Sequence, residues 1–389
     1  MLLAPGDYQL GRFQTLHAGS TDQPIRVKAQ SPSETRILTS ENETFVIHHS
    51  HWHFINLTLI GNQASEHAFH ISGDADYVLI QSCHLQNFDN HIKANGTETG
   101  FPDNLTIEGC ELFNERPRSG RKPSSPIDII GSSNVNIRNN YLHDFGNDLD
   151  GGISYGMFLK GRSNHGRIEQ NLIVCADKHQ GIRAGISLGG GGTAPQFCAD
   201  SRCDYEHQNG LISNNIITNC TDAGIHLRNA KRSQIITNTL LFTAGIDIDP
   251  GNSSATLYRN YIGGTVNQGK GATVRLMGNR ITGSNWSIYH PKIHRWLEQP
   301  LPAVPRWLQN SPLGLGHEQV RQDFHEPEKL DLTPTETTHF TAPPASPPNL
   351  QLPAQDYRGN PRGKTPWIGA LDYDISSPVV LKNSPVKTQ

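Results

Sequence analysis

The 389-residue sequence lacks the features that mark several common classes of protein. No apolar run is long enough to cross a membrane, so we expect a soluble protein without a membrane partner. Its 33 basic and 36 acidic side chains nearly balance, so no overall positive field favours nucleic acid as a partner. Its six cysteines include no Cys-x-x-Cys spacing, which argues against a zinc module. No signal peptide opens the chain, and Pro5 to Tyr8 already has the pattern of a first strand and turn, so we expect that part of the natural N-terminus is missing.

What the chain does contain is a short repeat: an apolar residue, two positions of any type, an Asn or Cys, one further position, and a second apolar residue. The steps between copies run from 19 to 44 residues, which suits short strands and turns rather than helices. Stacked units of this kind form a parallel β-helix, in which each coil buries its apolar positions on the next. We therefore predict an all-β fold, a single right-handed parallel β-helix from about Leu3 to Gly283 with no helix inside a coil. The copies are Phe54/Leu57/Leu59, Ile80/Cys83/Leu85, Ile107/Cys110/Leu112, Ile137/Asn140/Leu142, Ile168/Asn171/Ile173, Ile212/Asn215/Ile217, Ile235/Asn238/Leu240, Leu257/Asn260/Ile262 and Leu276/Asn279/Ile281.

The repeat stops after Ile281, and the residues that follow Trp296 are rich in proline and polar side chains. We predict two parts: a β-helix domain over residues 1–295, and an irregular tail over residues 296–389 that packs on the β-helix or caps its end.

The cysteines divide by their position in the repeat. Cys83 and Cys110 occupy the Asn position and are expected to be buried thiols, and Cys175 and Cys220 lie just past it and should also be packed. The Asn position itself should form an internal ladder, because an inward Asn can bond the coils above and below it. Cys198 and Cys203 stand in the longest insertion, where they could form a disulfide, which would indicate a periplasmic or secreted protein.

A second strand precedes most copies of the repeat by eight or nine residues. Strand side chains alternate, so the residues on either side of its central apolar position share the outward face. Charged side chains from at least five coils would then line one groove, although a merely solvated charged face is the alternative. The central residues are Ile71, Ile92, Ile129, Leu159, Leu188, Leu227 and Ile248; one flank is His70, His91, Asp128, Phe158, Ser187, His226 and Asp247, and the other is Ser72, Lys93, Ile130, Lys160, Gly189, Arg228 and Asp249.

The stretch from Gly151 to Gly192 departs from the regular repeat. It places Lys160 in a short apolar strand, Arg183 follows 23 residues later, and four consecutive glycines begin at Gly189. Local breaks in a regular scaffold favour function, so we expect the active groove here, with a long loop between coils as the alternative.

Two loops could serve the groove. Glu115 to Pro126 holds the cations Arg116, Arg118, Arg121 and Lys122, which would suit a polyanionic ligand. The loop from His143 to Gly152 gathers Asp144, Asp148 and Asp150, whose oxygens could bind Ca²⁺, although an ordinary polar turn has the same composition. No organic cofactor is expected.

The coil pattern and the closing segment resemble secreted bacterial parallel β-helix repeat proteins. Such proteins commonly end in a motif of the type Asp-x-x-Gly-x-Pro-Arg followed by Ile-Gly-Ala, which this chain matches at Asp356, Gly359, Pro361, Arg362, Ile368, Gly369 and Ala370. Among enzymes with this fold, the arrangement around Lys160 is distantly similar to polysaccharide lyase family 6, the chondroitinase B and alginate lyase type. That resemblance implies a catalytic Lys at Lys160 and a catalytic Arg about one coil later at Arg183, while strand register favours Arg228. The glutamates that bind Ca²⁺ in that family are replaced here by the residues from Gly152 to Tyr155.

The chemistry leads to the same hypothesis. A lyase that cleaves a uronate polymer by β-elimination must neutralise the carboxylate, remove the C5 proton and protonate the leaving oxygen. Lys160 or Tyr155 could be the base, Arg183 or Arg228 could hold the carboxylate, and His226 could act as acid or base. Substrate contacts are expected from Lys93, His91, Asp128, Asp247, Asp249, Arg116, Arg118 and Arg121.

Three alternatives remain at this stage. Asp247 and Asp249, with Asp128 further along, keep a glycoside hydrolase open. A C5-epimerase would use nearly the same residues as the lyase. A carbohydrate-binding or adhesive β-helix is the non-enzymatic option, although few aromatic residues fall in the groove positions.

Overall fold

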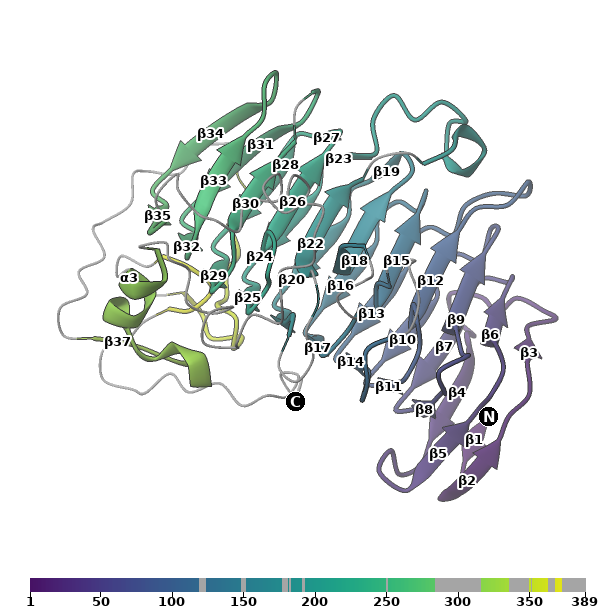
Figure 1. Cartoon of the computed structure of the whole chain (residues 1–389). Coiled ribbons are helices and arrows are strands. Elements are labelled where there is room, and N and C mark those ends of the chain that lie inside the picture. The colour runs from purple at the N-terminus through teal and green to yellow at the C-terminus, as the bar shows by residue number, and fades with distance from the viewer. Residues whose placement is uncertain are drawn as a thin grey trace.

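The computed structural model is a parallel β-helix, as the repeat predicts (Figure 1). It describes residues 1–118, 124–147, 152–176, 181, 183–190, 193–249, 251–283, 316–335, 350, 352–362 and 368–372. Three long parallel sheets run the length of the molecule, and each coil contributes one short strand to each sheet. The stacked coils are seen side by side in Figure 1, from the purple N-terminal end to the green end.

The three sheets are called A, B and C in the order in which a coil visits them. Sheet A consists of β1 (Leu2–Leu3), β4 (Ile25–Ala29), β7 (Trp52–Ile55), β10 (Leu79–Gln81), β13 (Thr106–Glu108), β16 (Asn136–Arg138), β20 (Arg167–Glu169), β24 (Leu211–Ser213), β28 (Ser233–Ile236), β31 (Ser254–Tyr258) and β34 (Thr273–Met277). Sheet B consists of β2 (Gly6–Gln9), β5 (Thr35–Leu38), β8 (Thr58–Ile60), β11 (His84–Gln86), β14 (Glu111–Phe113), β17 (Tyr141–His143), β21 (Leu172–Val174), β25 (Ile216–Thr218), β29 (Thr239–Leu241), β32 (Tyr261–Ile262) and β35 (Arg280–Ile281). Sheet C consists of β3 (Phe13–Gln14), β6 (Glu43–Ile47), β9 (His67–Ser72), β12 (Ile92–Asn95), β15 (Ile127–Ile130), β18 (Ser154–Lys160), β22 (Arg183–Gly189), β26 (Ile225–Arg228), β30 (Gly245–Ile248) and β33 (Thr265–Gln268).

The predicted ladder lies at the turn between sheets A and B. The amide group of Asn171 donates to the side-chain oxygen of Asn215 over 2.9 Å, and Asn215 makes the same 2.9 Å bond to Asn238. The backbone N–H of each ladder Asn also donates to the next side chain, so the ladder satisfies polar groups that the coil interior would otherwise leave unpaired. Cys83 and Cys110 continue the ladder as buried free thiols, as expected.

The first two coils belong to the same stack although their sequences show the pattern poorly. Val27 pairs with Phe54 in sheet A, and Ile37 pairs with Leu59 in sheet B. No α-helix interrupts a coil within the described residues of the β-helix; a short 3-10 turn, η1 (Pro195–Phe197), lies in the longest insertion.

Two disulfides join cysteines of the described chain. Cys198 pairs with Cys203, as predicted. Cys175 pairs with Cys220, with Cα atoms 4.9 Å apart, so the expectation that these two are simply packed thiols was wrong. They follow equivalent strands of neighbouring coils, β21 and β25, which places them next to each other.

The described parts of the C-terminal tail pack mainly on the outer face of sheet B, and Leu350 and Leu352 pack on outward residues of sheet A. They include the helix α3 (Gly316–Asp323), the two-stranded sheet of β36 (Phe324–Glu326) and β37 (Asp331–Pro334), and the 3-10 turn η2 (Pro327–Lys329). Its apolar side chains form one buried cluster with outward residues of sheet B. A small corner sheet of β19 (Ser163–Asn164), β23 (His207–Gln208) and β27 (Ala230–Lys231) connects sheets C and A in the central coils.

Candidate functional site

Sheet C presents two columns of outward side chains along its length, and polar groups are frequent in both. Each position in one strand lies opposite the same position in the next strand, so the columns follow from the register alone. The first column is His70, Lys93, Asp128, Phe158, Ser187, His226, Asp247 and Asn267, and the second contains Ile130, Lys160, Gly189 and Arg228, with Asp249 following in the next coil.

Lys160 and Arg228 stand on either side of a strand that carries only small outward residues. β22 lies between their strands and presents Ala184, Ser187 and Gly189 on this face. Gly189 lies opposite Arg228 with a φ of 77°, and a Cβ there would fall 1.9 Å from the Arg228 carbonyl oxygen, so no larger residue fits. Because adjacent strands lie about 4.8 Å apart, Lys160 and Arg228 leave sheet C about 9.6 Å apart with no side chain of the sheet between them.

Aromatic rings form the next part of this surface. The Tyr155 ring lies 6.0 Å from the His226 ring, with the two planes 26° apart, and 6.0 Å from the Phe158 ring. Tyr155 and His226 belong to strands on either side of β22, so the small residues of β22 are what allow the two rings to meet. The Lys160 ammonium lies 4.6 Å from the centre of the Phe158 ring.

The cations of sheet C differ in how they are paired. Lys93 forms an ion pair of 2.5 Å with Asp128, and Arg228 Nε lies 3.5 Å from an Asp249 oxygen. Within the described part of the chain, Lys160 has no carboxylate partner of this kind. An ammonium group without a carboxylate partner on a surface of small residues is available to an anionic ligand.

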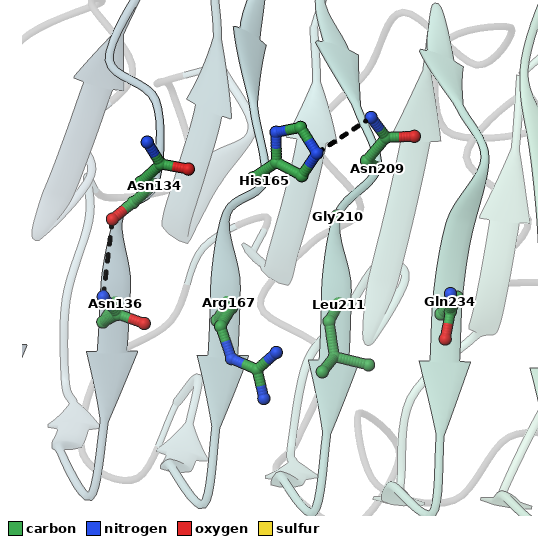
Figure 2. A pocket seen from close by; sticks show the side chains of 8 residues that line it. All are labelled: Asn134, Asn136, His165, Arg167, Asn209, Gly210, Leu211 and Gln234. Atoms are coloured by element: carbon green, nitrogen blue, oxygen red, sulfur yellow. Dashed lines mark hydrogen bonds between the residues drawn. The ribbon is translucent and has the colours of Figure 1, made fainter. Parts of the chain in front are cut away.

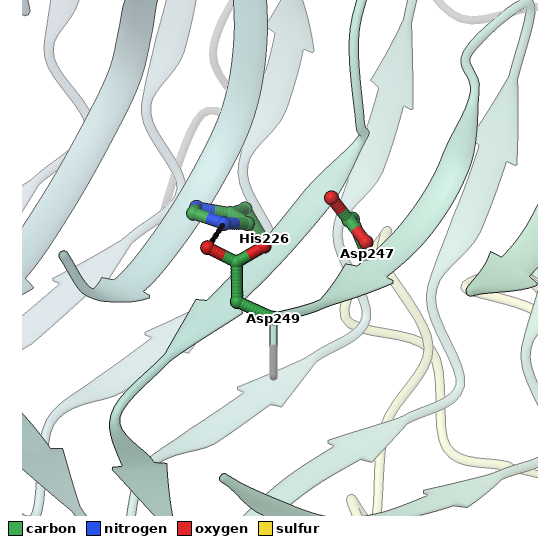
Figure 3. Close-up of side chains that lie close together, drawn as sticks. All are labelled: His226, Asp247 and Asp249. Carbon is green, nitrogen blue, oxygen red and sulfur yellow. Dashed lines mark ion pairs between the residues drawn. The ribbon is translucent and has the colours of Figure 1, made fainter. Parts of the chain in front are cut away.

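His226, Asp247 and Asp249 form a second cluster at the edge of this surface (Figure 3). Their ligand atoms all lie within 4.8 Å of one another, so the group could hold a metal ion. His226 Nε2 lies 3.4 Å from Asp249, and its Nδ1 lies 3.2 Å from the Ser187 hydroxyl. One imidazole nitrogen and two carboxylates suit a divalent cation, but Arg228 contacts the same Asp249 oxygen and would compete with an ion there.

Glu206 fixes the insertion beside Lys160. This buried carboxylate accepts hydrogen bonds from the Gly161 backbone N–H at 2.8 Å and from the Thr193 hydroxyl at 2.8 Å. Arg162 extends the support through an ion pair of 2.7 Å with Asp200 in the disulfide loop. The end of β18, and with it Lys160, is therefore held by both its sheet and the loop. The sequence pattern did not single out Glu206, because a lone Glu in an insertion carries no periodic signal.

The structure brings four of the five proposed catalytic residues together: Lys160, Arg228, Tyr155 and His226 share one area of sheet C. The fifth, Arg183, is fully buried and does not reach this surface. Its guanidinium donates to the carbonyl oxygens of Phe145 and Asn147, at 2.9 Å for the latter. The expectation that Arg183 contacts a substrate carboxylate is therefore wrong for this structure, because its donors face backbone carbonyls.

The position of His91 was also predicted wrongly. Ala94, not Ile92, is the central residue of β12, since Ala94 pairs with both Ile71 and Ile129. The shift of two residues moves Lys93 into the first column and removes His91 from the outward face. His91 is fully buried, its Nε2 donates to the Phe113 carbonyl oxygen over 3.0 Å, and burial lowers its pKa to about 3. It is a neutral core residue.

Further along sheet C, the other expected binding residues are already paired. Asp128 is held by Lys93 as described, and the buried Asp247 accepts a hydrogen bond from Asn267. At the N-terminal end, Glu43 forms ion pairs with His70 at 2.5 Å and with Arg12 at 3.0 Å. Burial raises the pKa of Glu43, but these two partners outweigh it and leave the pKa lowered overall.

The basic loop is only partly a surface feature. Arg116 is exposed, whereas Arg118 is buried and donates to backbone carbonyls of three residues in the loop at 62–65, which makes it a structural residue. Arg121 lies outside the described residues. Of the proposed Ca²⁺ ligands, Asp148 and Asp150 also lie outside them, and Asp144 is buried and paired with His143 at 3.0 Å. The group that could hold a metal is instead His226, Asp247 and Asp249.

Comparison with solved structures agrees with this architecture. The chain superposes on the crystal structure of pectate lyase Pel9A with a TM-score of 0.58 and 12% sequence identity, covering 96% of this chain and 87% of that one. Weaker similarity is found to an alginate lyase from Paenibacillus sp. str. FPU-7 (TM-score 0.37, 13% identity, 72% of this chain and 90% of that one) and to a PL6 family polysaccharide lyase from Pseudopedobacter saltans (0.34, 14%, 72% and 87%).

No family model and no curated protein matches the sequence. Within the described residues, no helix combines the length and hydrophobicity that crossing a membrane requires. At these levels of identity the similarity concerns the fold: the chain has the parallel β-helix architecture of the pectate lyase structure.

Proposed function

We propose that this protein is a polysaccharide lyase that cleaves an anionic, uronate-containing polysaccharide on the outer face of sheet C. The observation that carries the proposal is the arrangement of Lys160, Gly189 and Arg228: two cations lie on either side of a residue without a side chain, and one of them, Lys160, has no carboxylate partner among the described residues. A glycine at this position allows a sugar ring to approach the sheet closely. The resemblance to polysaccharide lyases noted in the sequence agrees with this choice.

Each group then has one role in the elimination. Arg228 pairs with the uronate carboxylate and makes the C5 proton more acidic. Lys160 removes that proton, with Tyr155 as the alternative base. The electron pair of the C5–H bond forms the C4–C5 double bond as the C4–O bond breaks. His226, positioned between Ser187 and Asp249, donates a proton to the leaving oxygen.

The same residues leave a place for a divalent cation. Bound by His226, Asp247 and Asp249, an ion of the Ca²⁺ type would supply positive charge to the substrate carboxylate. In that case His226 would be a ligand and the proton for the leaving oxygen would come from Tyr155 or water.

A glycoside hydrolase is the second candidate, because the ligand oxygens of Asp247 and Asp249 lie within 4.8 Å of each other. Retaining hydrolases place their two carboxyl groups at about 5–5.5 Å, which is similar. Asp247, however, is buried and hydrogen-bonded to Asn267, and both carboxylates project from one strand and the residue after it. Carboxylates in this arrangement do not stand on opposite sides of a bond.

The reaction product tests this proposal, because a lyase forms an unsaturated sugar. Purified protein is incubated with alginate, pectate and chondroitin, and the ultraviolet absorbance of the unsaturated sugar is followed with and without added Ca²⁺ or a chelator. Replacing Lys160 with Ala should lower turnover by about 10²-fold or more, as the loss of a positioned base does, without changing the melting temperature. Lys28, an exposed lysine on sheet A, provides the matched control: Lys28→Ala should retain full activity.

Two results would contradict the lyase. Reducing sugar released without any unsaturated product, and lost in Asp247→Asn or Asp249→Asn, would establish the hydrolase. Normal turnover in both Lys160→Ala and Tyr155→Phe would remove the bases assigned here.

We also propose that the protein works outside the cytoplasm. Its two disulfides are typical of oxidising compartments, and polymeric uronates are extracellular substrates. Thiol counting on denatured, unreduced protein from an exporting host should find two free thiols, those of Cys83 and Cys110. Six free thiols would exclude the disulfides.

A further inference from the structure

A polar hollow of about 310 Å³ lies outside the candidate site, on the corner where the coil enters sheet A (Figure 2). Its side chains come from four successive coils, and they belong to strands of sheet A and to the turns before them. The proposed lyase chemistry uses none of them. A volume of this size is at the lower end of the range of about 300–1,000 Å³ for small-molecule sites, which suits one or two sugar rings rather than a folded partner.

The hollow has two rows of side chains. The upper row consists of Asn134, His165 and Asn209, each at the same corner of its coil, with φ values of 55°, 54° and 55°. Such left-handed conformations at non-glycine residues are uncommon, and Asn is among the residues that adopt them most readily. The regular corner therefore repeats one polar side chain in each coil, about 4.8 Å from the next.

The lower row follows the register of sheet A. Asn136 pairs with Arg167, Arg167 with Leu211, and Leu211 with Gln234. Leu211 and Gly210 add an apolar area among these polar groups. The hollow thus combines amide, guanidinium and imidazole groups with one apolar floor, and these polar groups include both donors and acceptors.

Internal hydrogen bonds hold part of this array in place. His165 Nε2 lies 3.2 Å from the Asn209 amide, and its Nδ1 contacts Asn164. Arg167 Nε forms an ion pair with Glu169 over 2.8 Å, so its charge is balanced on the protein. Gln234 is different: its side-chain oxygen is buried without a hydrogen-bond partner among the described residues. A buried acceptor without a donor is costly, and because the Gln234 side chain as a whole is only partly buried, a small movement would let it bond to a ligand in the hollow.

We propose that this hollow is a second saccharide-binding site, which takes one or two sugar residues of a polysaccharide chain. Hydroxyl groups donate and accept hydrogen bonds, as this mixed lining requires, and the apolar Leu211 suits the non-polar face of a sugar ring. Because the Arg167 charge is balanced by Glu169, we expect the hollow to contact the hydroxyl groups of the sugar residues rather than their carboxylates. The identity of the polysaccharide, a uronate polymer, rests on the proposed function. The site would hold the polymer on the protein while sheet C acts on another part of it.

Binding can be measured without turnover. In the Lys160→Ala background, electrophoresis through gels containing alginate, pectate or chondroitin gives an apparent Kd for each polymer. The substitution Gln234→Ala removes the unpaired acceptor, and Asn136→Trp fills the hollow from a partly exposed strand position. Thr256→Ala is the matched control, because Thr256 pairs with Gln234 in the next coil but does not line the hollow.

We expect Gln234→Ala and Asn136→Trp to weaken retention by about tenfold or more, the effect of losing one or more good hydrogen bonds, while Thr256→Ala remains like the parent. Parent-like retention in both hollow variants with unchanged melting temperatures would overturn the proposal, and so would the absence of retention by every polymer in the parent.

Failure of this site and failure of the lyase give different results. With Lys160 intact, Gln234→Ala should cleave short oligosaccharides at the parent rate and long polymers with a raised KM. If a polymer is retained through the hollow but no variant yields product, the second site stands and the lyase falls. If product forms and the hollow variants bind normally, the lyase stands and the second site falls.

Discussion

The outer faces of sheets B and C come from the same coils but have opposite characters. On sheet B, the outward positions of the C-terminal half carry Tyr141, Leu172, Ile216, Leu241 and Tyr261, all nearly or completely buried. On sheet C, the corresponding half carries the polar and aromatic groups of the candidate site. Within the described residues, the tail covers sheet B, whereas sheet C has no comparable apolar cluster on its outer face.

The difference shows how the outward positions of a solenoid can be interpreted. An apolar outward column in a strand indicates that another part of the chain covers it, because an exposed apolar patch of that size is unfavourable. A polar column of mixed charge is compatible with water or with a ligand. The strands β21, β25 and β29 are buried at every position, whereas β11 and β14 alternate, and the sequence shows this change before any tail is considered.

The largest expected effect is on the free energy of unfolding, and it concerns the outer face of sheet B that the tail covers. Asp323, at the end of α3, is buried and receives two hydrogen bonds of 2.6 Å from Arg280 and one of 2.8 Å from the Tyr261 hydroxyl. Asp323→Ala leaves these donors unpaired, and we expect a loss of about 3 kcal/mol in the free energy of unfolding, the lower end for breaking a buried pair because Arg280 is partly exposed.

Urea denaturation measures this loss. Glu328→Ala is the control, since Glu328 pairs with Arg321 on the exposed side of the same tail and should cost no more than about 1 kcal/mol. Equal losses in the two variants would mean that the covering segment is not anchored through Asp323.

A smaller effect is expected on substrate binding at the outer face of sheet C. Arg228→Lys keeps the positive charge but loses the fork of donors that matches a carboxylate, so we expect KM to rise about tenfold with little change in stability. Steady-state kinetics on the best uronate polymer provide the measurement. Arg138→Lys, on sheet A and paired with Glu108, is the control that should leave KM unchanged. A melting temperature that drops in Arg228→Lys would assign Arg228 a structural role, like that of Arg183.

Arg228 and Arg183 show how much of the candidate site the sequence alone can predict. Register predicted that Arg228 shares a column with Lys160, and the strand pairing agrees. Arg183 matched the family spacing in sequence distance but lies at the start of β22, where its side chain turns to the carbonyls of the loop at 145–147. Sequence distance does not show on which side of a strand a residue lies.

The same limit explains the other errors. The β12 coil contains Ile92 and Ala94 two residues apart, and both fit an inward position, so the sequence pattern alone does not show which of them is central. Cys175 and Cys220 are 45 residues apart because of the insertion, although they follow equivalent strands. The regular coils were predictable because each repeats the same contact, whereas insertions remove the period on which register depends.

The smallest expected effect is on the pH dependence of stability, and it concerns residues at the edge of the part of sheet B that the tail covers. There Glu111 bonds His84 at 2.9 Å and His143 at 3.1 Å, and His143 also bonds Asp144. Burial lowers the pKa of His143, but Asp144 and Glu111 outweigh it and the pKa is raised above 6.5. Burial likewise raises the pKa of Glu111, but the two histidines outweigh it and hold the pKa at about 2 instead of 4.5.

The signs of the two shifts define a pH window. The raised pKa of His143 stabilises the fold below pH 6.5, and this is lost as the pH rises through the folded value. The lowered pKa of Glu111 stabilises the fold above pH 4.5, and this is lost as the pH falls towards 2. In urea denaturation at several pH values, Glu111→Gln should therefore differ most from the parent between these limits. A difference that is constant from pH 3 to 8 would contradict the network.

The segment that covers sheet B also determines when the protein can finish folding. A solenoid contacts mainly its neighbours in sequence, so its coils can form one after another during synthesis. The closing segment instead reaches back 131 residues from Ala370 to Thr239 and 186 residues from Asp356 to Gln170. Until these residues leave the ribosome, the apolar column of sheet B remains uncovered on an otherwise complete stack. The closing segment therefore sets how long the nascent protein exposes a surface on which it can aggregate.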